Sequence, residues 1–120
     1  MNTRGEVGAA RGRSQQEMQD EMADVRKRID ALDDEIVALF AKRQRQIERA
    51  AAVKPLLGMP ARVPERVDEV LARVLGAARR EGLSAALAMT VWTSVIEWSI
   101  DYEEKLMGDR VSKGDGKAVD

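Results

Sequence analysis

Apolar residues recur at alternating intervals of three and four positions along the first half of the chain. They are Met22, Val25, Ile29, Leu32, Ile36 and Leu39. This spacing places the side chains on one face of an α-helix and predicts that the face is buried. We expect a helix over residues 17–54, ended by Pro55. At about 55 Å it exceeds the usual length of a globular helix, so we expect it to pair with another long helix.

Two further helices are predicted from the second half of the chain. Pro64 is a good first-turn residue, and Gly82 is a good stop for the second helix. Ser84 is a candidate N-cap for the third helix, and Gly108 is its expected end. No stretch reads as a strand and no internal repeat is visible. The pattern therefore predicts an all-α fold with three helices and one long N-terminal helix.

The two ends of the chain lack apolar periodicity. Residues 1–15 are rich in glycine and arginine, and we expect them to form a disordered arm. Residues 108–120 predict a disordered tail, which leaves a helical domain over residues 16–107. The N-terminus lacks the apolar core of a signal peptide, and no apolar run reaches the length of a membrane span. We therefore expect a cytoplasmic protein.

Composition narrows the possible chemistry. A chain of 120 residues with 44% apolar and 34% charged residues can form one folded domain, and its small core favours dimerisation. The net charge of -1 gives no general reason to expect nucleic-acid binding. Cysteine and histidine are absent, which removes the thiol nucleophile, the usual general base and the commonest metal ligand. We expect no metal and no cofactor, so an enzyme of this composition would act by positioning and electrostatics.

Several ionisable residues fall on faces that otherwise read as core. Arg43 occupies the next position of the apolar seam, and Lys54 follows eleven residues later on nearly the same face. Glu103 and Ser99 lie on an apolar stripe of the third helix, and Arg66 is in the first turn of the second helix, where a cation is unfavourable. A buried charge is costly unless a partner meets it. The pattern predicts a pocket for an anionic ligand.

Arg26 flanks the same seam at its N-terminal end. It lies seventeen residues before Arg43, which is about 25 Å along one helix. Both arginines cannot hold one small ligand from the same straight helix. An antiparallel dimer would bring Arg26 of one chain beside Arg43 of the other.

Each of these charges also has an ordinary structural explanation. Arg43 can reach the surface, or it can pair with Glu48 or with a carboxylate on the third helix. Lys54 can be a cation at a helix C-terminus, and Glu103 can lie at the surface. The remaining explanations are ion pairs of Arg66 with Glu65 or Glu69 and of Arg26 with Asp30. Taken together the charges favour the ligand pocket, because structural ion pairs rarely put so many cations on apolar faces.

The order and spacing of these residues resemble the all-helical chorismate mutase family. The resemblance rests on the pattern RxxIDxLDxxIxxLxxxR from Arg26 to Arg43, on Lys54 eleven residues later, and on Arg66 twelve residues after that. It covers residues 24–106. The resemblance implies three-helix subunits that intertwine as a homodimer with two active sites, and the rearrangement of chorismate to prephenate. It also implies that no cofactor is needed.

The resemblance also implies roles for the cationic residues. Arg26 would enter from the partner subunit and, with Arg43, grip a carboxylate of the substrate. Lys54 would contact a carboxylate and the ether oxygen, and Arg66 the ring side or a carboxylate. By the same resemblance, Arg43 and Lys54 count as catalytic, whereas Arg26 and Arg66 bind substrate.

Glu103 would complete the catalytic group, and Ser99 would contact a substrate carboxylate. The resemblance places Glu103 where it hydrogen-bonds the ether oxygen as the bond breaks. An ionised carboxylate cannot donate that hydrogen bond. We therefore expect Glu103 to act in its protonated form, which burial favours and the neighbouring Lys54 opposes.

Two positions depart from the family pattern. Val63 and Val67 stand where well-known bacterial mutases carry acidic residues, the second of which contacts the ring hydroxyl of chorismate. The local sequence VPERV is more similar to a subgroup that contains isochorismate pyruvate lyases, which make salicylate, and aminodeoxychorismate mutases. The expected function is a chorismate mutase, with these two activities as alternatives. A non-catalytic ligand-binding module and a plain helical dimerisation protein complete the possibilities.

Overall fold

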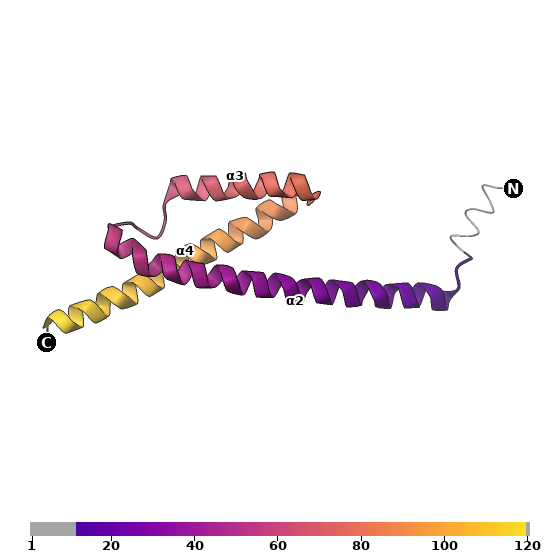
Figure 1. The fold of residues 1–120 in the computed structure, drawn as a ribbon, viewed down its shortest axis with the longest axis horizontal. Helices are drawn as coiled ribbons and strands as arrows, with labels where there is room; N and C mark the ends of the chain where they lie inside the picture. Colours follow the sequence, from indigo (N-terminus) through magenta and orange to yellow (C-terminus); the bar gives the residue numbers. More distant parts are fainter. Residues whose placement is uncertain (1–11, 120) are drawn as a thin grey trace. The chain divides into compact units, whose positions relative to one another are not determined.

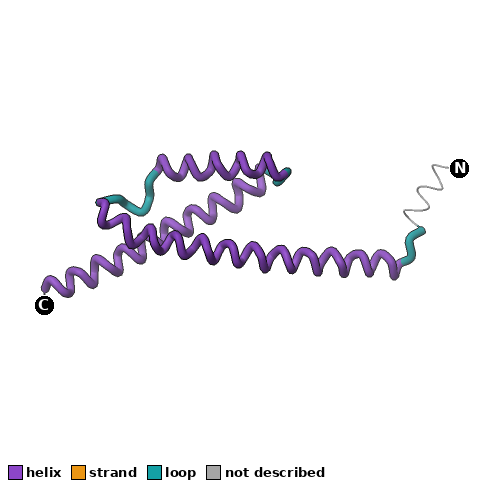
Figure 2. Tube along the Cα trace, viewed as in Figure 1, coloured by secondary structure: helices purple, strands orange, loops and turns teal. Residues whose placement is uncertain are grey.

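The computed structural model describes residues 12–119 of the chain. Its elements are α2 (Gln15–Val53), the short 3-10 helix η1 (Lys54–Leu57), α3 (Pro64–Glu81) and α4 (Ala85–Val119), as Figure 1 shows. Across residues 12–119 there is no strand (Figure 2). The predicted all-α class, with three helices and a long first one, is confirmed. Within the described residues, no helix combines the length and apolar character needed to cross a membrane.

Local signals at the helix ends act largely as predicted. Pro64 begins α3, and Gly82 caps it with a φ of 70°, in the left-handed region that suits glycine. Ser84 caps α4, because its Oγ accepts a hydrogen bond from the backbone N–H of Leu87 at 3.2 Å. Pro55 ends α2 but is itself part of η1, which Gly58 closes with a φ of 65°.

The predicted end of the last helix at Gly108 is wrong. α4 continues past this residue to Val119. A glycine ends a helix when it adopts a left-handed conformation, as Gly58 and Gly82 do, whereas Gly108 keeps the helical one. Inside a helix a glycine costs only about 1 kcal/mol relative to alanine, which the helix tolerates. Residues 1–11 of the predicted arm lie outside the described residues. The domain limits 16–107 and the disorder of the ends stay predictions.

The chain divides into two compact units, Met1–Ala41 and Lys42–Asp120. In the first unit, the described residues belong mainly to α2. The sequence pattern predicts that the apolar seam is buried, but the structure shows it exposed. The seam side chains are 41–63% exposed. The periodicity identifies an apolar face, but it does not say what covers that face. No other element of this unit is described that does so.

The second unit contains the core. Ala61, Ile96 and Ile100 form its buried centre, and α3 packs against α4 beside them. Three further alanines are buried, namely Ala51 near the end of α2, Ala78 on α3 and Ala88 on α4. Small side chains at these places let the helix backbones approach closely. The segment between η1 and α3 contributes Ala61 to this core.

Candidate active site

A cavity of about 340 Å³ opens in the second unit. Its wall comes from the end of α2, the start of η1, the segment before α3, the first turns of α3 and the middle of α4. Five of the six predicted site residues line it, namely Arg43, Lys54, Arg66, Ser99 and Glu103. The volume suits a small organic ligand. The structure therefore brings residues from α2, η1, α3 and α4 to one cavity.

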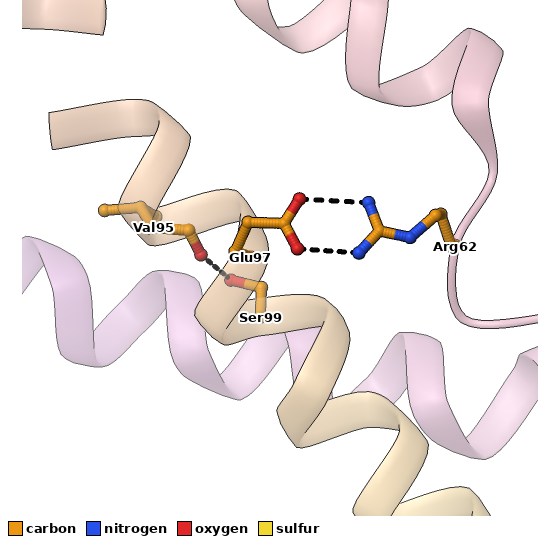
Figure 3. Close-up of polar contacts among 4 residues, drawn as sticks. All are labelled: Arg62, Val95, Glu97 and Ser99. Carbon is orange, nitrogen blue, oxygen red and sulfur yellow. Dashed lines mark hydrogen bonds and ion pairs between the residues drawn. The ribbon is translucent and has the colours of Figure 1, made fainter. Parts of the chain in front are cut away.

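Arg43 enters this cavity from α2. Its Nη1 donates a hydrogen bond to Ser99 Oγ at 2.9 Å, and Ser99 Oγ donates to the carbonyl of Val95 at 2.7 Å (Figure 3 shows the second bond). Burial, then repulsion by Arg66, lowers the pKa of Arg43, although Glu103 opposes the shift. Within the described part of the chain, no carboxylate forms an ion pair with Arg43. A cation held in this way favours the binding of an anion.

Arg43 does not form the ion pair with Glu48 that the sequence also allows. Glu48 is engaged elsewhere, because its Oε2 accepts a hydrogen bond from the hydroxyl of Tyr102 at 2.7 Å. That bond lowers the pKa of the Glu48 carboxyl, and it raises the pKa of the Tyr102 hydroxyl. Glu48 therefore takes part in the contact between α2 and α4, and Arg43 remains available to a ligand in the cavity.

Lys54 and Glu103 form a buried ion pair in the wall of the cavity. Lys54 Nζ lies 2.9 Å from Glu103 Oε1, and the two side chains are 17% and 5% exposed. The ammonium also donates a hydrogen bond to the carbonyl of Ala61 at 2.7 Å. Glu103 Oε1 is buried, and the ion-pair geometry does not complete a directed hydrogen bond to it. The surface place considered for Glu103 is therefore wrong.

A buried ion pair of this kind contributes little net free energy to the stability of the fold. Removing two charges from water costs about as much as their attraction returns, so buried pairs are often retained for another reason. Here Lys54 and Glu103 lie in the wall of a cavity, where a ligand can approach both. This placement favours a functional explanation over a structural one.

Arg66 stands at the rim of the cavity, in the first turn of α3. Its guanidinium forms an ion pair with Glu69, so this ordinary explanation is confirmed. The side chain is 60% exposed. It still lines the cavity, and its charge is near enough to Arg43 to lower the pKa of that residue. The rim therefore carries a second guanidinium.

The rest of the wall is mostly apolar and was not predicted from the sequence as a set. It consists of Ile47, Ala50, Ala61, Val63, Val67, Val70, Ile96 and Ile100, with Gln46 as an additional polar member. The carbonyl of Ala61 is the least predictable partner, because a backbone acceptor has no residue-type signal. An apolar wall facing two guanidinium groups and an ion pair suits a compact organic anion with an apolar ring.

Arg26 lies on α2 within the unit Met1–Ala41, and its side chain is exposed. Its predicted entry into the pocket of a partner chain stays a prediction. No group of acidic, histidine or cysteine side chains able to hold a metal ion occurs among the described residues.

Comparison with known proteins gives a consistent result. Residues 25–104 match the family described as chorismate mutase type II. The chorismate mutase of Methanocaldococcus jannaschii is 24% identical over 96 residues, which cover 80% of this chain and 97% of that protein. The T-protein of Haemophilus influenzae is 38% identical over 66 residues, or 55% of this chain, but these span only 18% of that protein. No solved structure matches the chain.

Proposed function

The chain belongs to the chorismate mutase type II family, and on this basis we propose that it rearranges chorismate to prephenate. The observation that supports this activity best is the cavity that joins Arg43, Lys54 and Glu103. The substrate is a dicarboxylate enol ether, and its Claisen rearrangement is unimolecular. It needs no nucleophile, metal or proton relay, so positioning and electrostatic stabilisation are sufficient.

The residues of the cavity divide this work between them. Arg43, held by Ser99, binds one carboxylate, and Arg66 binds at the more exposed rim. Lys54 and Glu103 meet the ether oxygen, where negative charge develops as the carbon–oxygen bond breaks. The apolar wall packs against the ring and favours the compact conformer in which the reacting carbons approach each other.

The proton on Glu103 is a separate part of the proposal. Lys54 Nζ lies 2.9 Å from Glu103 Oε1, a contact that suits a carboxylate, whereas donation to the ether oxygen requires the acid. We expect that the substrate, which brings its own negative charge to Lys54, favours protonation of Glu103. The wild-type kcat should then fall as pH rises, while Glu103→Gln, which donates at any pH, should give a flat profile. Identical flat profiles for both proteins would contradict this role.

We also propose a homodimer in which Arg26 acts in the partner's site. The support is the exposed apolar seam of the first unit, which a second copy of the same seam would cover. If Arg26 acts in trans, Arg26→Ala and Arg43→Ala are each inactive, but a mixed dimer contains one intact site.

This gives a direct prediction. Co-refolding equal amounts of Arg26→Ala and Arg43→Ala should restore about a quarter of wild-type turnover, because half of the dimers are mixed and each has one working site. The two variants measured separately are the controls. If Arg26 serves its own chain, both sites of the mixed dimer are defective, so the mixture would stay inactive.

One specific observation favours a substrate other than chorismate. Val63 and Val67 line the cavity, so these two positions offer no carboxylate to a ring hydroxyl. This supports two alternatives, an isochorismate pyruvate lyase, which would release salicylate and pyruvate, and an aminodeoxychorismate mutase. Arg43, Lys54 and Arg66 would bind the carboxylates of the substrate in either enzyme.

Product analysis separates these activities. The purified protein is given chorismate and isochorismate in separate reactions, and the products are identified by mass spectrometry. Prephenate as the main product supports the mutase. Salicylate and pyruvate, formed from isochorismate at higher efficiency, support the lyase. No product from either compound supports the aminodeoxychorismate mutase or the non-catalytic module, and tight binding of a ligand without turnover supports the module.

A further inference from the structure

An ion pair outside the cavity joins two distant parts of the second unit. Arg62 Nη1 donates to Glu97 Oε1 at 3.0 Å, and Nη2 donates to Oε2 at 2.6 Å (Figure 3). The partners are 35 residues apart, one before α3 and the other on α4. The other exposed ion pairs of the described residues join partners no more than eight positions apart. This bidentate contact therefore has a different role from the local pairs.

The segment that Arg62 anchors also supports the candidate catalytic lysine. Ala61 precedes Arg62, and its carbonyl accepts the hydrogen bond from Lys54 Nζ at 2.7 Å. The second partner of this ammonium is Glu103, at 2.9 Å. The place of the Ala61 carbonyl therefore helps to set where the charge of Lys54 lies.

Apolar burial holds this segment only weakly. Ala61 is 6% exposed and packs with Ile96 and Ile100, but its side chain is a single methyl group. The residues on both sides, Pro60 and Arg62, are exposed. The same two segments thus meet twice, through Ala61 and Ile96 inside and through Arg62 and Glu97 outside.

We propose that Arg62 and Glu97 are positioning residues, whose ion pair holds the Ala61 carbonyl where it orients the Lys54 ammonium. This inference rests on the proposed function, because it assigns the pair to the catalytic step. Exposed ion pairs contribute little to stability, but a bidentate arginine–carboxylate contact fixes direction as well as distance. The mutual hydrogen bonds lower the pKa of the Glu97 carboxyl and raise that of Arg62, so both groups stay charged near neutral pH.

The kinetic test uses Arg62→Ala, Glu97→Ala and the exchanged double variant Arg62→Glu/Glu97→Arg. For each single variant we expect kcat to fall about tenfold, because a small displacement of a catalytic group slows the chemical step. KM should change by less than about twofold, since the carboxylate-binding arginines are untouched. The exchanged variant should recover most of the lost kcat. The matched control is Arg28→Ala, which breaks the exposed pair with Asp24 and should leave both constants unchanged.

A second readout does not depend on turnover. In protein labelled with ¹⁵N-lysine, the Lys54 ammonium resonance is assigned by its loss in Lys54→Met. We expect it to move in Arg62→Ala and Glu97→Ala and to stay in place in Arg28→Ala. An unmoved resonance, or a wild-type kcat in both single variants, would overturn the positioning role. A moved resonance in a protein that converts neither chorismate nor isochorismate would overturn the proposed function and leave the positioning of Lys54 intact.

Discussion

Replacing Arg43 with alanine is expected to lower kcat/KM about a thousandfold while the protein stays folded. Arg43 is the guanidinium that enters the cavity from α2, and it donates a hydrogen bond to Ser99 Oγ. Removing it leaves a substrate carboxylate without its charged partner. It also removes the repulsion from Arg66 and the cost of desolvating a cation. The melting temperature should therefore be unchanged or higher. Steady-state kinetics and thermal unfolding measure the two effects separately.

Arg45→Ala is the matched control for this experiment. Arg45 lies two residues away on the same helix, and its side chain is exposed. Its loss should change kcat/KM little. Retained activity in Arg43→Ala would remove this arginine from the site. If the wild-type protein neither bound nor converted a ligand, the stability of Arg43→Ala would instead fit a plain dimerisation protein.

The helices were largely predictable because their signals are local. Periodicity locates the apolar face, and Pro64, Gly82 and Ser84 act within one turn of their own positions. Gly108 misled the prediction because a glycine has to adopt the left-handed conformation to end a helix, and the residue type alone does not decide that. The sequence pattern also could not predict whether the apolar seam is buried, because burial depends on what covers the first unit.

The candidate site was predictable to the extent that its residues break a local pattern. Arg43, Lys54 and Glu103 each place a charge on an apolar face, and the structure brings them to one cavity. The carbonyl of Ala61 has no such signal. The Arg62–Glu97 pair has none either, because both residues are exposed and 35 positions apart, so neither disturbs the periodicity of its own element.

Replacing Lys54 with methionine is expected to have the largest effect on the protein, because it changes both catalysis and stability. Turnover should fall at least a thousandfold or so, since the cation that meets the ether oxygen is lost. Glu103, only 5% exposed, then loses its ion-pair partner, and the carbonyl of Ala61 loses its donor. Breaking a buried pair from one side costs about 3 kcal/mol of unfolding free energy. Denaturant unfolding, monitored by helix content, gives this value directly.

The double variant Lys54→Met/Glu103→Gln separates the two effects. Removing the second charge ends the penalty of an unpaired buried carboxylate, so most of the lost stability should return. Turnover should not return, because methionine supplies no charge to the ether oxygen. If activity returned together with stability, Lys54 would serve only to neutralise Glu103. The proposed contact of the ammonium with the substrate would then be wrong.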